Sequence, residues 1–151
     1  MISKIEVKNF KSLKGIETEL KNLNVLMGLN GMGKSSFIQI LLVLMQSDKL
    51  EDKIIDLKGT LAQIGQGRDA FYQFSEEDFI LFGISFLPST HFNWKFQYEK
   101  DKEKLIAESG FSKEQMIYFR EKTRKFQYIG ANRIGPQEIY DASSIVVADK
   151  K

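Results

Sequence analysis

The sequence lacks cysteine, has a single histidine and contains no long apolar run, and each of these absences excludes a class of protein. Without cysteine there is neither a disulfide framework nor a thiolate metal site. A lone histidine, His91, excludes any site that needs two or more histidine ligands from this chain. The longest apolar run, residues 38–45 with Gln39 inside it, is far shorter than the ~20 residues needed to cross a bilayer.

No charge of one sign dominates either, because 22 basic residues face 20 acidic ones and the net charge is +2. This balance is too even to indicate nucleic acid or an anionic membrane by itself. Residues 1–6 lack the apolar stretch of a secretory signal. The 42% hydrophobic and 28% charged residues are typical of a globular domain. We therefore expect a cytoplasmic protein with one core and no membrane partner.

In the first part of the chain, the hydrophobic pattern predicts strands at residues 5–10 and 16–20, joined by a turn. Residues 23–27 are apolar and end at Gly28, which is typical of a buried strand that leads into a loop. Residues 34–45 are apolar on nearly every side, which predicts a buried helix.

In the second part, residues 54–59 predict a short strand and turn, and 60–78 a surface loop. Residues 79–86 and 92–98 predict an antiparallel hairpin, because the second run alternates aromatic and polar residues. Residues 112–115 fit a capping box and predict a helix to about Arg124. We expect one more short strand at 126–130. The end of the mixed segment 131–151 is compatible with another.

A phosphate-binding pattern, Gly-x-x-x-x-Gly-Lys-Ser (Walker A), is matched by Gly28, Gly33, Lys34 and Ser35. With glycine at roughly 7% of residues, a chance match in such a chain is on the order of one per cent or less. The pattern requires a strand before it and a helix after it, and both are predicted here. The sequence therefore predicts a P-loop that binds ATP or GTP.

The chemistry of this loop assigns a role to each residue type. Glycines at 28, 31 and 33 allow backbone conformations that are closed to other residues. The amides from about Asn30 to Ser36 are expected to surround a phosphate, supported by the helix N-terminus near Gly33. Lys34, the candidate catalytic residue, is expected to contact the β- and γ-phosphates, Ser35 to bind Mg²⁺, and Ser36 to bond the α-phosphate region. The predicted cofactor-binding residues are Gly28, Leu29, Asn30, Gly31, Met32, Gly33, Lys34, Ser35 and Ser36.

Within this loop, Asn30-Gly31 before Met32-Gly33-Lys34-Ser35 resembles the form common in ABC-type ATPases. Residues 5–14, with Asn9-Phe10 before the turn, resemble the opening of the RecF, SMC and OLD group. Segments 56–59, 64–65 and 128–136 are similar to a bacterial AAA-labelled subset of that group. Many members of the subset sit in anti-phage defence operons beside a nuclease. The resemblance is strong over residues 1–47 and weaker, but in the right order, beyond them.

This resemblance implies an α/β fold, the N-terminal lobe of an ABC-type P-loop ATPase with a mixed sheet and an antiparallel β region. The strand, P-loop and helix would occupy 23–46, the β-rich region about 54–98 and a further helix about 112–124. It also implies ATP and Mg²⁺ as cofactors and a homodimer or higher oligomer that closes around ATP. DNA and a nuclease partner are possible partners under the same resemblance.

Three motifs of the ABC-type ATPases are absent: a Walker B Asp-Glu, a Leu-Ser-Gly-Gly-like signature and a switch histidine. Residues 145–149 end an apolar run with an aspartate, but Lys150 stands where the catalytic glutamate belongs. We therefore expect a fragment of a longer protein, which binds nucleotide weakly and hardly hydrolyses it by itself. The alternative is a nucleotide-binding scaffold without hydrolysis that regulates a nuclease partner. A GTPase lacks support because there is no Asn-Lys-x-Asp motif, and a small kinase because there is no arginine-rich lid.

Some weaker signals remain open. Lys11 and Ser12 resemble a family turn near the nucleotide but are equally compatible with a solvated turn. Gln127 and Gln137 are candidates for a Q-loop glutamine without diagnostic context. Arg133 is interpreted as a surface arginine and His91 as an exposed bystander. The aromatic residues of 79–98 are interpreted as core rather than as a base-stacking surface, and the mixed-charge run 99–104 as a solvated strand end or turn rather than a DNA-binding patch.

Overall fold

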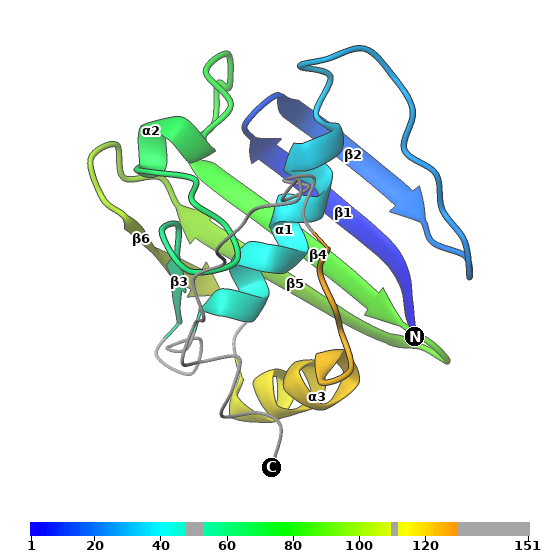
Figure 1. The fold of residues 1–151 in the computed structure, drawn as a ribbon. Coiled ribbons are helices and arrows are strands. Elements are labelled where there is room, and N and C mark those ends of the chain that lie inside the picture. Colours follow the sequence, from blue (N-terminus) through cyan, green and yellow to red (C-terminus); the bar gives the residue numbers. More distant parts are fainter. Residues whose placement is uncertain (48–52, 110–111, 130–151) are drawn as a thin grey trace, which may run out of the picture.

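The computed structural model describes residues 1–47, 53–109 and 112–129, which form one antiparallel sheet with helices on one side (Figure 1). The sheet has six strands in the order β2-β1-β4-β5-β6-β3. The strands are β1 Ile2–Phe10, β2 Leu13–Glu19, β3 Ile54–Asp56, β4 Phe79–Phe86, β5 Thr90–Gln97 and β6 Lys104–Ser109. The helices are α1 Lys34–Gln46, α2 Gly67–Ala70 and α3 Lys113–Thr123.

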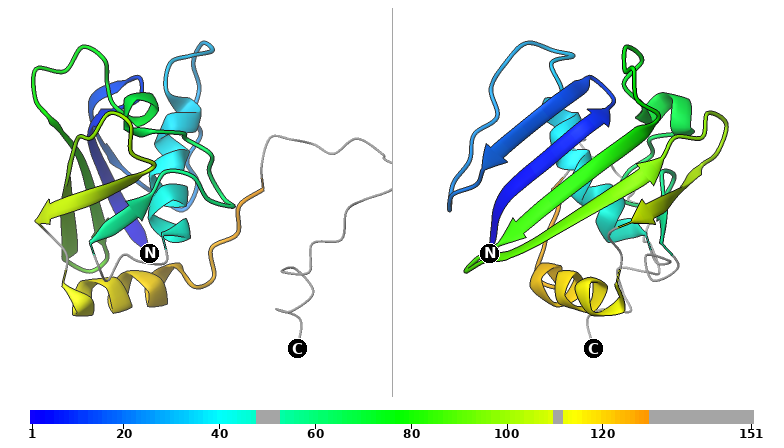
Figure 2. Two further views of the ribbon diagram at one scale, coloured as in Figure 1. Left: turned by 90° about the vertical axis from the view of Figure 1, so that its left-hand side faces the viewer. Right: turned by 180° about the vertical axis from the view of Figure 1, so that it is seen from behind.

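The two faces of the sheet differ in polarity because side chains alternate along each strand. On β5, Phe92, Trp94 and Phe96 are buried, while His91 before them and Asn93 between the first two are exposed. This confirms the predicted alternation and the interpretation of these aromatic residues as core. Helix α1 lies across the apolar face, and no described helix covers the other face (Figure 2). The core therefore lies between α1 and the sheet.

Helix α1 is largely buried, as its composition predicts, with Ile40, Leu42, Val43 and Leu44 at most 1% exposed, but its Ile38 side is open at 38%. Its last residue, Gln46, bonds the segment after β3: Nε2 donates to Asp56 O and Ala62 O, and Oε1 accepts from the amides of Leu61 and Ala62. These bonds fix the C-terminal end of α1 to that segment. No helix in the described ranges is long and apolar enough to span a membrane.

Helix α3 begins at the predicted capping box. The Ser112 side chain accepts from the Gln115 amide, and the Gln115 side chain accepts from the Ser112 amide. Phe119 packs on the core with its ring centroid 5.7 Å from that of Trp94. The predicted helix boundaries are confirmed to within one residue.

The segment 60–78, predicted as a surface loop, is partly core. Ala62, Ile64 and Ala70 are buried, and α2 forms one short turn within it. A main-chain bond from the Lys11 amide to Ala70 O joins this segment to the β1–β2 turn at 2.8 Å. These apolar residues are few and widely spaced, so the hydrophobic pattern of the sequence did not predict their burial.

The buried strand predicted at 23–27 is wrong for the described structure. Leu23, Val25 and Met27 are 82%, 71% and 86% exposed, and no strand forms there. The chain leaves the sheet after the Leu20 amide donates to Ser3 O, and β2 is an edge strand. A short apolar strand is buried only when neighbouring strands flank it, and none of the described strands does. The predicted mixed sheet is also wrong for the described residues, because all of their strand pairs are antiparallel.

Two further predictions about strands differ from the structure. Residues 104–109 form β6, which was not predicted because only Leu105 and Ala107 are buried and the exposed Ile106 between them hides the alternation. Residues 126–129 form no strand, and Gly130 lies outside the described residues. The candidates Arg133, Gln137, Lys150 and segment 145–149 also lie outside them.

Candidate functional site

The loop that enters α1 has the backbone that its glycines were expected to provide. Gly28, Gly31 and Gly33 have φ angles of 148°, 84° and 87°. A Cβ at Gly33 would collide with Leu13 Cδ2 and stand 3.0 Å from Ser12 Oγ. Glycine at this position therefore lets the β1–β2 turn pack directly against the loop.

The N-terminus of α1 carries a positive electrostatic potential that no side chain offsets. Its N-cap, Gly33, is left-handed, no side chain caps the helix, and no acidic residue occupies the first turn. The first intrahelical bond runs from the Phe37 amide to Gly33 O, so the amides of residues 34–36 have no carbonyl partner in the helix. Free amides and the helix dipole together favour an anion at this position.

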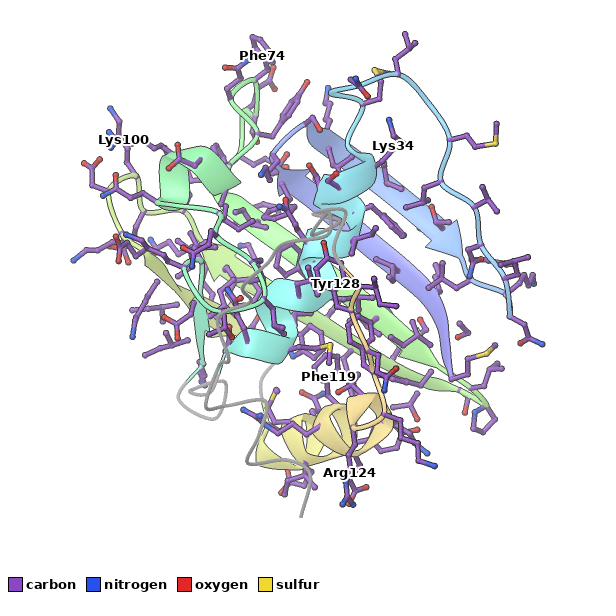
Figure 3. The ribbon with its side chains drawn as sticks, viewed as in Figure 1. Lys34, Phe74, Lys100, Phe119, Arg124 and Tyr128 are labelled. Atoms are coloured by element: carbon purple, nitrogen blue, oxygen red, sulfur yellow. The ribbon has the colours of Figure 1, made fainter. Side chains whose placement is uncertain are left out.

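Lys34 folds back onto the loop that precedes it. Its Nζ donates to Gly28 O at 2.6 Å and to Leu29 O at 2.7 Å (Figure 3). The ammonium group thus joins the start of the loop to the first residue of α1. Ser35 is exposed and Ser36 is buried. The side chains of Leu29 and Met32 are largely exposed and carry no N–H or O–H group, so these residues can donate to a phosphate only through their main chain.

Lys11, in the β1–β2 turn, is not a simple solvated residue. It adopts a φ of 53°, and its Nζ donates to Gln39 Oε1 of α1 at 3.1 Å. Burial lowers the pKa of the Lys11 amine, and the nearby Asp69 carboxylate opposes that shift. Non-glycine residues rarely adopt this backbone conformation, so the turn holds a lysine at a position where glycine or asparagine is easier. Its contact with a nucleotide stays a prediction.

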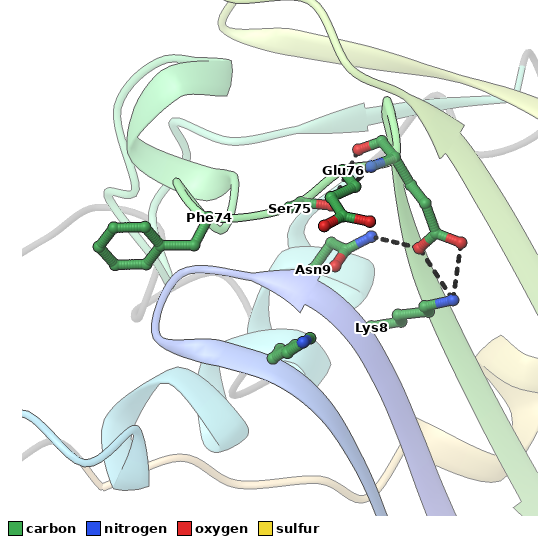
Figure 4. A pocket seen from close by; sticks show the side chains of 7 residues that line it. Lys8, Asn9, Phe74, Ser75 and Glu76 are labelled. Carbon is green, nitrogen blue, oxygen red and sulfur yellow. Dashed lines mark hydrogen bonds and ion pairs between the residues drawn. The ribbon is translucent and has the colours of Figure 1, made fainter.

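Asn9, which contributed to the resemblance, has a structural task. It is buried with a φ of 59°, and its Nδ2 donates to Phe79 O at 3.1 Å and to Glu77 Oε2 at 3.2 Å (Figure 4). Lys8 Nζ bonds the same carboxylate at 2.8 Å. The bonds from Lys8 and then Asn9 hold the pKa of Glu77 below its ordinary range. Sequence reasoning missed Glu77 because it lies 68 residues from Asn9.

Two further candidates, His91 and Gln127, lie on the surface. His91 is exposed, as expected, with Nδ1 2.8 Å from Ser85 Oγ. It sits beside Phe86, which pairs with Ile2 at the end of β1 opposite the β1–β2 turn. Gln127 is exposed after α3. In the described ranges, no three His, Cys, Asp or Glu side chains group as metal ligands.

Comparison with known proteins now defines the family. A family model described as the AAA ATPase domain matches residues 1–144 of the 151. The chain belongs to the AAA ATPase domain family. The family consists of ATP-binding ATPases that generally use ATP with Mg²⁺. No curated protein and no solved structure matches the chain.

The loop of this AAA ATPase domain has the chemistry that ATP and Mg²⁺ require. Its uncapped helix N-terminus suits a phosphate, and Lys34 adds a cation beside it. The Ser35 hydroxyl is exposed at the same helix end. Because the described residues contain no acidic cluster, Mg²⁺ would depend on Ser35 and on the phosphate oxygens. The residues present therefore fit the two cofactors.

Proposed function

We propose that this AAA ATPase domain binds MgATP through residues 28–36 and is the N-terminal lobe of a RecF/SMC/OLD-like ATPase. The observation that carries the proposal is helix α1, which begins at a left-handed glycine, has no side-chain cap and no acid in its first turn, and places the Lys34 ammonium on the carbonyls of Gly28 and Leu29. This combination offers an anion several donors and one full charge.

Each residue of the loop has a definite task in this proposal. The amides of Asn30 to Ser36 donate to phosphate oxygens, and Lys34 exchanges its two carbonyl partners for the β- and γ-phosphates. The Ser35 hydroxyl holds Mg²⁺, which when bound neutralises charge on the phosphates. Ser36 donates near the α-phosphate. These groups position the triphosphate and stabilise charge, but none of them activates a water molecule.

The groups that complete hydrolysis come, in this proposal, from other elements of the ATPase or from a second copy. The exposed apolar side chains of residues 23–29 support it, because such a run is normally covered by protein. We infer that covering turns this segment into the strand that its sequence favours. A homodimer or higher oligomer that closes around ATP, with DNA or a nuclease as partner in DNA maintenance or anti-phage defence, follows from the family resemblance.

A second function, nucleotide binding without hydrolysis in a scaffold that regulates a nuclease, is favoured by one observation. The described residues hold no acidic cluster that could bind Mg²⁺ and activate a water molecule. Binding of ATP without turnover in the assembled protein would support this scaffold over the ATPase.

The test is the affinity for MgATP of the full chain and of Lys34→Ala, measured by calorimetry. Loss of a charge-assisted contact to phosphate predicts roughly 10- to 100-fold weaker binding. Lys21→Ala is the matched control, since that side chain is 76% exposed and lies outside the loop. Equal affinity of Lys34→Ala and the unchanged chain contradicts the proposal.

A further inference from the structure

A concave surface lies beside the P-loop, on the other side of the β1–β2 turn. It encloses about 400 Å³ between Lys11 and Ser12 of the turn, Arg68 of α2, and the loop that carries Tyr72 and Phe74. Ser12 belongs to both regions, because its Oγ stands 3.0 Å from the Cβ position of Gly33. A ligand held at the N-terminus of α1 therefore has this surface as its immediate neighbour.

The two regions also share one end of the molecule. Lys34 and Phe74 lie at the same end, whereas Phe119 and Arg124 lie at the other (Figure 3). The P-loop and the loop around Phe74 rise on either side of the β1–β2 turn (Figures 1 and 2). A molecule that extends from the P-loop across Ser12 reaches the Phe74 side.

Phe74 differs from its aromatic neighbours because its ring does not pack in the hydrophobic core. Phe71 stacks on Tyr98 with ring centroids 4.0 Å apart, and Phe82 is fully buried. Phe74 is 71% exposed, and its ring meets that of Tyr72 edge to face, with the two ring centroids 5.7 Å apart. Its ring points away from the Asn9–Glu77 cluster (Figure 4). An exposed aromatic face is the kind of surface on which a base stacks.

The loop that presents Phe74 is held in place by main-chain bonds. The Tyr72 amide donates to Asn9 O at 3.1 Å, and the Ser75 amide donates to Tyr72 O at 3.0 Å. The Ser75 hydroxyl also bonds Glu77 O at 2.9 Å. Asn9 is buried, so the loop is anchored in the fold while the ring faces outward. A surface ordered in advance in this way loses little entropy when a ligand binds.

The polar groups of the surface suit the rest of a nucleoside. Lys11 and Arg68 provide cations, Asp69 provides a carboxylate, and Ser12 provides a hydroxyl between the aromatic loop and the P-loop. Lys11 donates to Gln39, whereas Arg68 makes a solvent-exposed ion pair with Asp101 at 3.4 Å. An aromatic face with a nearby hydroxyl and cations matches a base, its ribose and the first phosphate.

We propose that Lys11, Ser12, Tyr72 and Phe74 form the nucleoside subsite of the ATP whose phosphates the P-loop holds, with the base stacked on the Phe74 ring. This inference rests on the proposed function, because it requires the triphosphate at residues 28–36. Stacking tolerates every base, so the subsite adds affinity for the nucleoside with little discrimination between ATP and GTP.

The experiment compares two ligands, MgATP and magnesium tripolyphosphate, by calorimetry on the full chain. The unchanged chain is expected to bind MgATP at least tenfold more tightly. Phe74→Ala is expected to lose about tenfold in affinity for MgATP and nothing for tripolyphosphate. Phe74→Tyr keeps an aromatic face and is expected to bind both ligands as the unchanged chain does. Ile117→Ala removes a side chain that is 49% exposed on α3, away from the P-loop, and is the matched control.

The outcomes separate the two proposals. Unchanged MgATP affinity in Phe74→Ala overturns the subsite, as does equal affinity of the unchanged chain for the two ligands. Equal weakening of both ligands by Phe74→Ala also overturns it, because the effect then lies in the loop rather than at the base. Binding of neither ligand by the unchanged chain refutes the proposed function itself.

Discussion

The β4–β5 hairpin and the segment 20–33 carry similar apolar side chains in opposite environments. Phe82, Trp94 and Phe96 of the hairpin are fully buried between strands and α1, whereas Leu23, Val25 and Met27 are mostly exposed. The difference lies in pairing, since β4 has a neighbour on each side and residues 23–27 pair with none of the described strands. An apolar segment thus forms a buried strand only where neighbouring strands pair with it.

This contrast also separates stability from function. The hairpin holds the centre of the sheet, while the segment without pairing leads into the P-loop. Segments with few buried contacts open at the lowest free-energy cost and are where binding loops are commonly found. The proposed site therefore lies where the described fold is held most weakly.

The largest effect is expected from truncating the hairpin core. Phe82→Ala removes a fully buried ring whose centroid lies 5.2 Å from that of Phe10 and 5.6 Å from that of Phe96. We expect it to lower the free energy of unfolding by about 3–5 kcal/mol in chemical denaturation. Phe74→Ala, the same change at an exposed ring, is the control and should cost under about 0.5 kcal/mol. Similar losses for both would mean that the hairpin is not the stability centre.

A smaller loss of stability is expected when glycines of the loop are replaced by alanine. The loss should increase as the space around the glycine decreases. Gly33→Ala meets Leu13 and also forces alanine into a left-handed backbone, whereas Gly31→Ala meets open space at a φ of 84°. The backbone alone should cost about 1–2 kcal/mol in each variant, with more lost at Gly33. Gly15→Ala, in open space without positive φ, should cost least. Denaturation midpoints that do not follow this order would contradict the loop geometry.

A pH-dependent effect is expected at the anchor of the Asn9 turn. The pKa of Glu77 in the folded protein lies below the ordinary value of 4.5, so its stabilising contribution is complete above that pH. It is lost as the pH falls through the lowered pKa, because the folded state binds the proton less readily than the unfolded state. Glu77→Gln should show a weaker fall in stability below pH 4.5 than the unchanged chain. Identical pH profiles would show that the carboxylate does not stabilise this turn.

The smallest effect is expected in the exposed segment. Val25→Ser and Met27→Ser replace side chains that are 71% and 86% exposed. The free energy of unfolding of the isolated chain should change by less than about 0.5 kcal/mol. A loss similar to that of Phe82→Ala would show that this segment is buried in solution, and the contrast between the two regions would fail.

Local signals in the sequence predicted local structure well. The capping box at Ser112, the alternation of β5 and the glycines before α1 each depend on residues within a few positions. For this reason α3, the hairpin and the start of α1 could be predicted with little error. The phosphate-binding residues were predicted on the same kind of signal, and their roles stay predictions.

Features that join distant residues could not be predicted. The anchor of Asn9 depends on Glu77, and the packing of Gly33 depends on the β1–β2 turn. Strand β6 buries only Leu105 and Ala107, too few for a clear period. The exposure of Phe74 results from the fold of its loop, because its sequence context does not distinguish it from the buried aromatic residues nearby.

Helix α1 connects two distant parts of the molecule as a rigid rod. One end carries the P-loop, and the other is fastened by the four bonds of Gln46, with Ser47 Oγ accepting from the Asp56 amide. Its 13 residues span about 20 Å at the usual helical rise. An axial displacement of the phosphate end must therefore either break the bonds of Gln46 or carry β3 and its following turn along. Under the proposed function, a force on a bound triphosphate would therefore reach β3 at the edge of the sheet.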